Sequence, residues 1–230
     1  MQAGSTVMKY YSQKEQDKWV IEEVFYGKRD GYFLDLAATD GIYLNNTLVL
    51  ETQYGWNGLC IEANPFFFNR LNVNRRCIRT DKCIDGKPGE VEFVLFNELG
   101  GIIDEDTDNN MATRLKPIEQ ARSRGAVIRL ATVPLASVLA EVNAPSTIDY
   151  FSFDVEGAET RILRSFPFEK YRFLALTIER PTPELNEILF SHGYVFVKNL
   201  SFDSFYVHES LEAVGQIKKE PFVQIPPKDW

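Results

Sequence analysis

The chain alternates continuous apolar runs with segments whose apolar residues recur at helical spacing. Continuous apolar runs are typical of strands buried on both faces of a parallel sheet. They predict strands at 32–36, 58–62, 77–80, 148–155 and 173–179. The segments with helical spacing predict helices at 14–26, 48–54, 65–71, 134–141, 159–166 and 183–192. Strands that alternate with helices in this way predict a doubly wound α/β domain.

The remaining segments predict additions to this domain. Further strands are expected at 91–96 and 127–133, and a terminal antiparallel pair at 194–197 and 205–208. Residues 97–125 contain a glycine pair and an acidic tract, which predicts an insertion or lid with a short helix. The predicted organisation is a flexible lead at 1–10, one domain at 11–210, and a C-terminal extension without a core pattern at 211–230.

Composition and charge narrow the class of protein. The 230 residues are 44% hydrophobic, which is enough for a packed core, and the net charge of −8 argues against a nucleic-acid-binding protein. The basic cluster of Arg70, Arg75, Arg76, Arg79 and Lys82 is interpreted as a solvated helix face. Three cysteines without a C-x-x-C pair favour a reducing compartment over a disulfide framework. No apolar run is long enough to span a membrane, so we expect a cytoplasmic protein.

Four predicted parallel strands end in acidic residues, namely Asp35, Glu62, Asp154 and Glu179. Open α/β sheets bind ligands beyond the carboxyl ends of their strands. One such acid is as often a helix cap as a ligand-binding group. Buried strands rarely carry carboxylates without a reason, however, so the set of four predicts a site at this edge.

The loop after the first strand, Ala37-Ala38-Thr39-Asp40-Gly41, indicates the kind of cofactor. It lacks the G-x-G-x-x-G pattern whose backbone approaches a pyrophosphate, which argues against a nicotinamide-dependent oxidoreductase. An acid at the end of the second strand, here Glu62, suits the hydroxyls of an adenosine ribose. S-adenosylmethionine has a ribose and a cationic sulfonium but no phosphate, and it fits this acidic edge better.

Several ordered motifs resemble one known family. They are F-L-D-L-A-A-T-D-G at 33–41, N-N-T-L-V-L-E at 45–51, G-W-N-G-L-C-I-E-A-N-P at 55–65 and D-Y-F-S-F-D-V-E-G-A-E at 149–159. Between about Tyr11 and Glu209 the chain resembles the FkbM-type S-adenosylmethionine-dependent methyltransferases. The resemblance implies a Rossmann-like methyltransferase fold: a mostly parallel seven-stranded sheet with an antiparallel last strand. It also implies methylation of a hydroxyl on a sugar of a glycan, glycolipid or glycosylated natural product.

The resemblance also implies a set of cofactor-binding residues. It places Asp35, Ala37 and Asp40 along the methionine part, Asn46 and Thr47 at its carboxylate or at the loop, and Glu62 at the ribose. Asp81 and Cys83 are expected near the adenine, and Gln13 and Ala63 are assigned to the same cofactor site. Many relatives have D-x-G-A where this chain has Asp35-Leu36-Ala37-Ala38, so Ala37 adds a methyl group close to the ligand.

Methyl transfer to a hydroxyl needs a group that takes or weakens its proton. The candidates for catalysis are Asp154, Glu156, Glu179 and His208. Neighbouring carboxylates either raise one another's pKa, which suits a base, or hold a hard cation. Asp154 with Glu179 is therefore either a base pair or a site for Mg²⁺ or Mn²⁺, and the sequence leaves both open. Glu159 is more simply explained as an acid in the first turn of a helix.

Two functions of different classes remain. The first is an S-adenosylmethionine-dependent O-methyltransferase with a carbohydrate acceptor, fused to glycosyltransferases or acting beside them. The second is a methyltransferase-fold binding or adaptor module whose cofactor site has decayed, which Ala37 suggests.

Overall fold

The buried apolar runs pair into one seven-stranded sheet in the order β10-β11-β9-β8-β1-β2-β3. The computed structural model describes residues 9–228. Every strand of this sheet runs parallel to the others except β11, which is antiparallel to both β9 and β10. The strands are β1 (Tyr32–Leu36), β2 (Asn57–Ile61), β3 (Ile78–Thr80), β8 (Thr147–Phe153), β9 (Arg172–Glu179), β10 (Tyr194–Leu200) and β11 (Asp203–His208).

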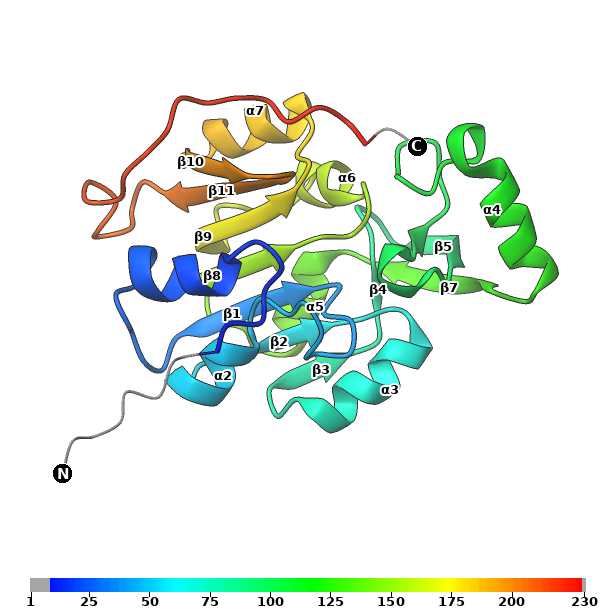
Figure 1. Cartoon of the computed structure of the whole chain (residues 1–230), viewed down its shortest axis with the longest axis horizontal. Coiled ribbons are helices and arrows are strands. Elements are labelled where there is room, and N and C mark those ends of the chain that lie inside the picture. The colour runs from blue at the N-terminus through cyan, green and yellow to red at the C-terminus, as the bar shows by residue number, and fades with distance from the viewer. Residues whose placement is uncertain (1–8, 229–230) are drawn as a thin grey trace.

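Helices cover both faces of the large sheet (Figure 1). The helices are α1 (Gln16–Trp19), α2 (Leu48–Tyr54), α3 (Pro65–Asn74), α4 (Met111–Ser123), α5 (Leu135–Glu141), α6 (Glu159–Arg164) and α7 (Pro183–Ser191). Successive strand residues point to opposite faces, so Phe33 and Leu34 of β1 enter different cores. Leu34 packs in the core shared with α5, α6 and α7, and Phe33 in the core shared with α1, α2 and Leu71 of α3. The predicted α/β fold with an antiparallel last strand is confirmed.

A second sheet of four strands has the order β4-β7-β5-β6. Its strands are β4 (Cys83–Ile84), β5 (Gly89–Val94), β6 (Gly101–Ile102) and β7 (Val127–Val133). The longer strands β5 and β7 agree with the alternating patterns in the sequence. The two-residue strands β4 and β6 have too few residues to show a pattern, and neither was predicted.

The expected insertion at 97–125 contains the 3-10 turn η2 (Asn97–Leu99), strand β6 and helix α4. Asn110 caps α4 by accepting a hydrogen bond from the backbone N–H of Ala112 at 2.7 Å. The preceding acidic tract is anchored by Arg161 of α6, which pairs with Asp104 at 2.9 Å and Asp106 at 2.8 Å. The insertion is thus attached to the large sheet through α6.

The N-terminal helix is shorter than its apolar pattern predicts. The α-helical turn α1 continues into a π-helical turn, η1 (Val20–Val24). Ser12 does not cap a helix with Glu15, which lies in the left-handed region at φ 57°. The hydroxyl of Ser12 instead donates to Asp17 at 2.5 Å. The buried carboxylate of Asp17 also accepts the backbone N–H of Tyr11 at 2.7 Å.

The predicted end segments are described in part. Residues 1–8 of the expected flexible lead lie outside the described residues, while Tyr10 donates to Glu22 at 2.6 Å. The C-terminal extension has no periodic pattern, yet Ile217 and Ile225 are buried. Across residues 9–228, no helix combines the length and the apolar character needed to cross a membrane.

Arg75 corrects the interpretation of the basic cluster as a solvated face, because its side chain is buried. Its guanidinium donates to Glu51 at 2.6 Å, to Asn45 at 2.9 Å and to Thr47 at 3.0 Å. Asn45 and Thr47 in turn donate to Asp35 of β1, at 2.9 and 2.6 Å. We name these five side chains the Arg75 network. It ties the end of α3 to the end of β1 and to the start of α2.

Replacing Arg75 with Met should destabilise the protein by about 3–5 kcal/mol, since removing one partner leaves buried charge uncompensated. Urea denaturation measures the change. Arg76→Met is the matched control, because the neighbouring Arg76 is exposed, and it should change the midpoint far less. Equal losses from the two variants would contradict the proposed importance of the Arg75 network.

Candidate active site

The carboxyl ends of β1, β2, β8 and β9 lie at one edge of the sheet and carry the predicted acids Asp35, Glu62, Asp154 and Glu179. Two adjoining pockets open at this edge and share Ala37, Thr39 and Glu98 in their walls. We call the pocket beside Glu62 the nucleoside pocket and the pocket beside Asp154 the acceptor pocket. The insertion contributes to both, because Glu98 belongs to η2.

The nucleoside pocket is a narrow slot lined mainly by apolar side chains. Glu62, Ala63 and Cys83 line it, as expected, together with apolar side chains such as Ile84 and Ile102. An apolar slot next to a carboxylate suits an aromatic base joined to a ribose. Asp81 is exposed and is not among the lining residues.

Glu62 is held in place by backbone groups. Its two carboxylate oxygens accept the N–H groups of Thr39 and Asn64, each at 2.8 Å. Burial raises the pKa of Glu62 to about 7, although these two hydrogen bonds favour the charged form. Each oxygen keeps a second lone pair, so the carboxylate is oriented and still able to accept from a ribose hydroxyl.

The part of the acceptor pocket next to the β1 loop provides groups for an amino acid moiety. Gln13, Asp35, Ala37 and Asn46 all line it. The amide nitrogen of Asn46 donates to Ser152 at 2.9 Å, whereas its buried Oδ1 has no hydrogen-bond partner among residues 9–228. Burying an acceptor without a donor is unfavourable, so this oxygen suits a ligand ammonium group.

Two predicted cofactor residues act on the loop instead of lining these two pockets. Asp40 accepts the backbone N–H groups of Ile42 and Tyr43, at 2.9 and 2.8 Å, and so shapes the turn after the loop. Thr47 is fully buried and belongs to the Arg75 network. Burial raises the pKa of Asp35, while Arg75 and the donors of the network favour its charged form.

Ala37 occupies the left-handed region at φ 68°. Its backbone N–H donates to Ile61 at 3.0 Å, and the next N–H, of Ala38, donates to the same carbonyl at 3.1 Å. This conformation costs an L-residue roughly 1–2 kcal/mol, and glycine adopts it freely. Glycine, which the family resemblance leads us to expect here, would adopt this conformation freely, whereas Ala37 adopts it at the cost of strain.

Acidic side chains gather on the far wall of the acceptor pocket. Asp154, Glu156, Glu179 and Asp203 line it, and Asp203, on β11, was not predicted. Burial within the pocket, followed by the charges of Glu179 and Glu156, holds the pKa of Asp154 well above its usual range. Asp154 is nevertheless accessible to solvent, because it faces the hollow. A carboxylate of this kind is a stronger base than an ordinary aspartate.

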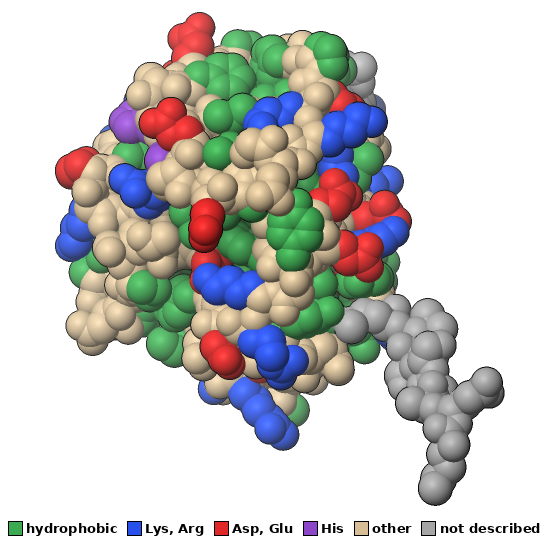
Figure 2. Space-filling view, turned by 90° about the vertical axis from the view of Figure 1, so that its left-hand side faces the viewer, with side chains coloured by type: hydrophobic (Ala, Val, Ile, Leu, Met, Phe, Trp, Pro, Cys, Tyr) green, Lys and Arg blue, Asp and Glu red, His purple; other side chains and the backbone are tan. Residues whose placement is uncertain are grey.

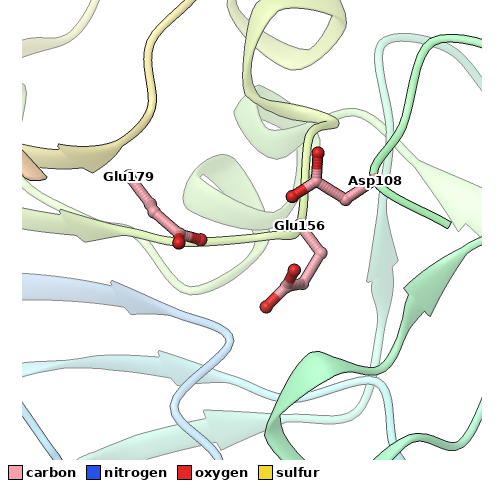
Figure 3. A group of neighbouring side chains, drawn as sticks. All are labelled: Asp108, Glu156 and Glu179. Carbon is pink, nitrogen blue, oxygen red and sulfur yellow. The ribbon is translucent and has the colours of Figure 1, made fainter. Parts of the chain in front are cut away.

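A tight carboxylate group adjoins this wall (Figure 3). It consists of Glu179 from the end of β9, Glu156 from the loop after β8, and Asp108 from the insertion. One oxygen of each residue lies within 4.8 Å of the others. Burial, and then Glu179, raise the pKa of Glu156 to about 7, and Lys228 opposes this rise. Glu156 itself lies at φ 56°, with Gly157 at φ 97° behind it.

His208 is not brought to this site. Because β11 is antiparallel, Asp203 pairs with Glu179 whereas Val207 pairs with Ala175, so the strand carries His208 toward the opposite edge of the sheet. Histidine side chains are visible on that opposite face in Figure 2. The ring of His208 hydrogen-bonds the carbonyl of His192 at 3.1 Å and the hydroxyl of Ser210 at 2.8 Å. We therefore leave His208 out of the proposed site.

Several site residues escaped sequence reasoning. In the sequence, Asn45 is only the first residue of the N-N-T-L-V-L-E motif, Asp108 is one acid in a tract, and Lys228 follows two prolines in the C-terminal extension. The acidic tract was a usable signal for the involvement of the insertion. Nothing in the local sequence distinguishes Lys228 from the other lysines, because its position depends on the path of the whole tail.

The sheet order and the paired pockets define a Rossmann-like methyltransferase. The chain matches the model of the methyltransferase FkbM domain over residues 35–206, which is well over half of its length. The chain belongs to this family, and S-adenosylmethionine is the cofactor expected from its sequence motifs. The unpartnered Asn46 Oδ1 and the oriented Glu62 fit the ammonium and ribose of this cofactor.

Several solved structures are similar to this chain at low sequence identity. Methyltransferase FkbM from Methylobacillus flagellatus KT is 14% identical with a TM-score of 0.46. The similar region covers 84% of this chain and 50% of that one. Precorrin-6y C5,15-methyltransferase from Geobacter metallireducens GS-15 is 10% identical with a TM-score of 0.41. The similar region covers 90% of this chain and 91% of that one. The N-terminal domain of human METTL16 in complex with SAH is 16% identical with a TM-score of 0.42. The similar region covers 83% of this chain and 66% of that one.

These likenesses concern the fold and carry no argument about the acceptor. The chain spans 64% of the METTL16 methyltransferase domain in another crystal form. No curated protein sequence gives a significant match.

The affinity for S-adenosylmethionine should rise with pH, by several-fold between about pH 6 and about pH 8. Glu62 has a pKa of about 7, and only its ionised carboxylate accepts hydrogen bonds at every lone pair. Calorimetric titration across this range measures the effect. Glu62→Gln should bind more weakly and with a flatter pH dependence, since it has no titrating group at this position. An equally steep profile in the variant would assign the dependence to another group.

Ala37→Gly should leave the free energy of unfolding unchanged or raise it by up to about 1 kcal/mol, because relief of strain offsets the extra entropy of glycine. Ala38→Gly is the control. Ala38 is buried and its φ is negative, so its loss should cost about 1 kcal/mol or more. Thermal unfolding compares the two, and similar destabilisation by both would rule out strain at Ala37.

Proposed function

We propose that this methyltransferase transfers the methyl group to a hydroxyl of a sugar in a glycan, a glycolipid or a glycosylated natural product. The observation that carries the proposal is Asp154, a carboxylate with a raised pKa that faces the acceptor pocket beside the methionine end of the cofactor site. The rest of the pocket supports a polyhydroxylated acceptor.

The walls of the acceptor pocket are rich in groups that hydrogen-bond hydroxyls. Gln13, Gln16 and Ser152 offer donors or acceptors, and Asp203 adds a carboxylate. Burial raises the pKa of Asp203 to about 7, and Gln16 donates to it at 3.1 Å. Fixed amide and carboxyl groups of this kind orient a hydroxyl-bearing ligand better than they bind an apolar one.

Bound S-adenosylmethionine supplies an electrophilic methyl group on a cationic sulfur. The protein residues must place an acceptor oxygen in line with that methyl group and remove its proton. In the proposed reaction the acceptor oxygen bonds to the methyl carbon, the carbon–sulfur bond breaks with its electrons going to sulfur, and Asp154 takes the hydroxyl proton. Asp35 and the β1 loop fix the methionine end so that the line of attack is maintained.

The charge of the chain supports the choice of acceptor. A net charge of −8 and an acidic pocket wall suit a neutral polyol and disfavour a polyanion such as nucleic acid. We further propose that the protein acts in glycan biosynthesis in the cytoplasm, beside glycosyltransferases or fused to them. The proposed catalytic unit is a single domain at 11–210.

Asp154→Asn should reduce turnover by roughly 10²–10⁴-fold, the usual contribution of a general base, while cofactor binding stays nearly unchanged. The assay follows the production of S-adenosylhomocysteine with a panel of sugar acceptors, and calorimetry follows cofactor binding. His208→Gln is the control, because His208 lies at the other edge of the sheet, and it should remain active. Full activity of Asp154→Asn would refute the assignment of the base.

The alternative, a binding or adaptor module with a decayed cofactor site, rests on the strained Ala37. Calorimetry with S-adenosylmethionine separates the two functions. Absence of binding at millimolar cofactor would favour the adaptor, and binding without methylation of any acceptor would direct the search to other hydroxyls.

A further inference from the structure

The last described segment, residues 217–228, runs back over α7 toward the site (Figure 1). Ile217 and Ile225 are buried, which fixes both ends of the segment. Phe222 packs edge-on against Phe190 and Phe196, with ring centroids 5.3 and 5.2 Å apart. Hydrogen bonds add to this packing: Glu220 N to Val197 O at 2.7 Å, Asn199 Nδ2 to Val223 O at 2.8 Å, Gln224 Nε2 to Pro181 O at 2.6 Å, Asn186 Nδ2 to Gln224 Oε1 at 2.9 Å and Arg180 Nη1 to Pro226 O at 3.1 Å.

This path delivers Lys228 to the tight carboxylate group. Its Nζ lies 2.8 Å from Oε2 of Glu156 and 3.5 Å from Oδ2 of Asp108. The Lys228 side chain is only 16% exposed and lines the acceptor pocket. Asp108 comes from the insertion and Glu156 from the loop after β8, so the ammonium joins three segments that are distant in sequence.

A divalent cation would need the same place. Mg²⁺ and Mn²⁺ bind carboxylate oxygens, and among the described residues Asp108, Glu156 and Glu179 offer the close set. The predicted alternative of a metal held by Asp154 and Glu179 shares Glu179 with this set. The ammonium of Lys228 already contacts two of the three residues, so the native arrangement does not fit a metal ion.

The charges keep Lys228 in its cationic form. Burial acts to lower the pKa of Lys228, but the carboxylates of Glu156, Glu179 and Asp108 outweigh burial and raise it. In return the ammonium opposes the rise in the pKa of Glu156. One positive charge thus offsets part of the repulsion among three buried or half-buried carboxylates.

We propose that Lys228 is the resident cation of the tight carboxylate group, occupying the position between Glu156 and Asp108 that a divalent metal would otherwise take. The acceptor-side carboxylates are then held together without a metal, and the hydroxyl proton passes to a carboxylate base. Lys228 is a positioning residue that acts through Glu156 and Asp108. Its relevance to the acceptor rests on the proposed function, but its occupancy of the cation position does not.

Titration with Mn²⁺, followed by electron paramagnetic resonance of the free ion, tests this inference without an activity assay. Wild type should bind Mn²⁺ weakly, whereas Lys228→Met should bind it at least roughly tenfold more tightly, because the competing charge is removed. Lys218→Met removes the same charge from an exposed position on the same segment and should behave as wild type. Lys228→Arg keeps the charge and should also behave as wild type.

The location is tested by adding Glu156→Gln to Lys228→Met, which should remove the new Mn²⁺ site. Stoichiometric Mn²⁺ binding by wild type, as tight as in Lys228→Met, would overturn the inference, as would unchanged weak binding in a folded Lys228→Met. If Lys228→Met fails to fold, tight binding by wild type or Lys228→Arg overturns the inference and weak binding by both supports it. Failure of the proposed function appears separately, as normal cofactor binding without methylation of sugars.

Discussion

The cofactor edge of this protein depends on one buried positive charge. Arg75, at the end of α3, reaches the β1 carboxylate Asp35 through Asn45 and Thr47 and also pairs with Glu51. Without this charge, the buried carboxylate at the end of β1 would be protonated or expelled. Gly41 shows how closely the parts fit, because a Cβ there would lie 2.6 Å from Cγ of Arg75 at a φ of +78°. Cofactor binding and folding therefore share the same polar core.

The acceptor side has the opposite balance, with several carboxylates and few cations. Burial and the neighbouring carboxylates raise the pKa of Asp154 well above its usual range and raise the pKa values of Glu156 and Asp203 to about 7. Arg161 and Lys228 limit the excess by anchoring the acidic insertion and the tight carboxylate group. The two ends of the site therefore differ in charge: a buried arginine compensates the carboxylate at one end, and carboxylates outnumber cations at the other.

Two segments outside the strands of the large sheet complete the acceptor pocket. These segments are the insertion at 97–125 and the tail at 211–228, which supply Asp108 and Lys228. Neither segment belongs to the strands that carry the cofactor.

The sequence by itself determined the α/β class, the strands with continuous apolar runs and the acids at their carboxyl ends, because burial pattern and chain order are local properties. It also indicated the cofactor, since Asp35, the Ala37–Gly41 loop and Glu62 follow one another along adjacent strands. Only the tertiary structure decided that Arg75 is buried, that His208 lies at the far edge, and that Asp108 and Lys228 meet Glu156. The direction of β11 places His208 away from the site, and the path of the C-terminal tail brings Lys228 to Glu156 and Asp108. Local sequence encodes neither of these features.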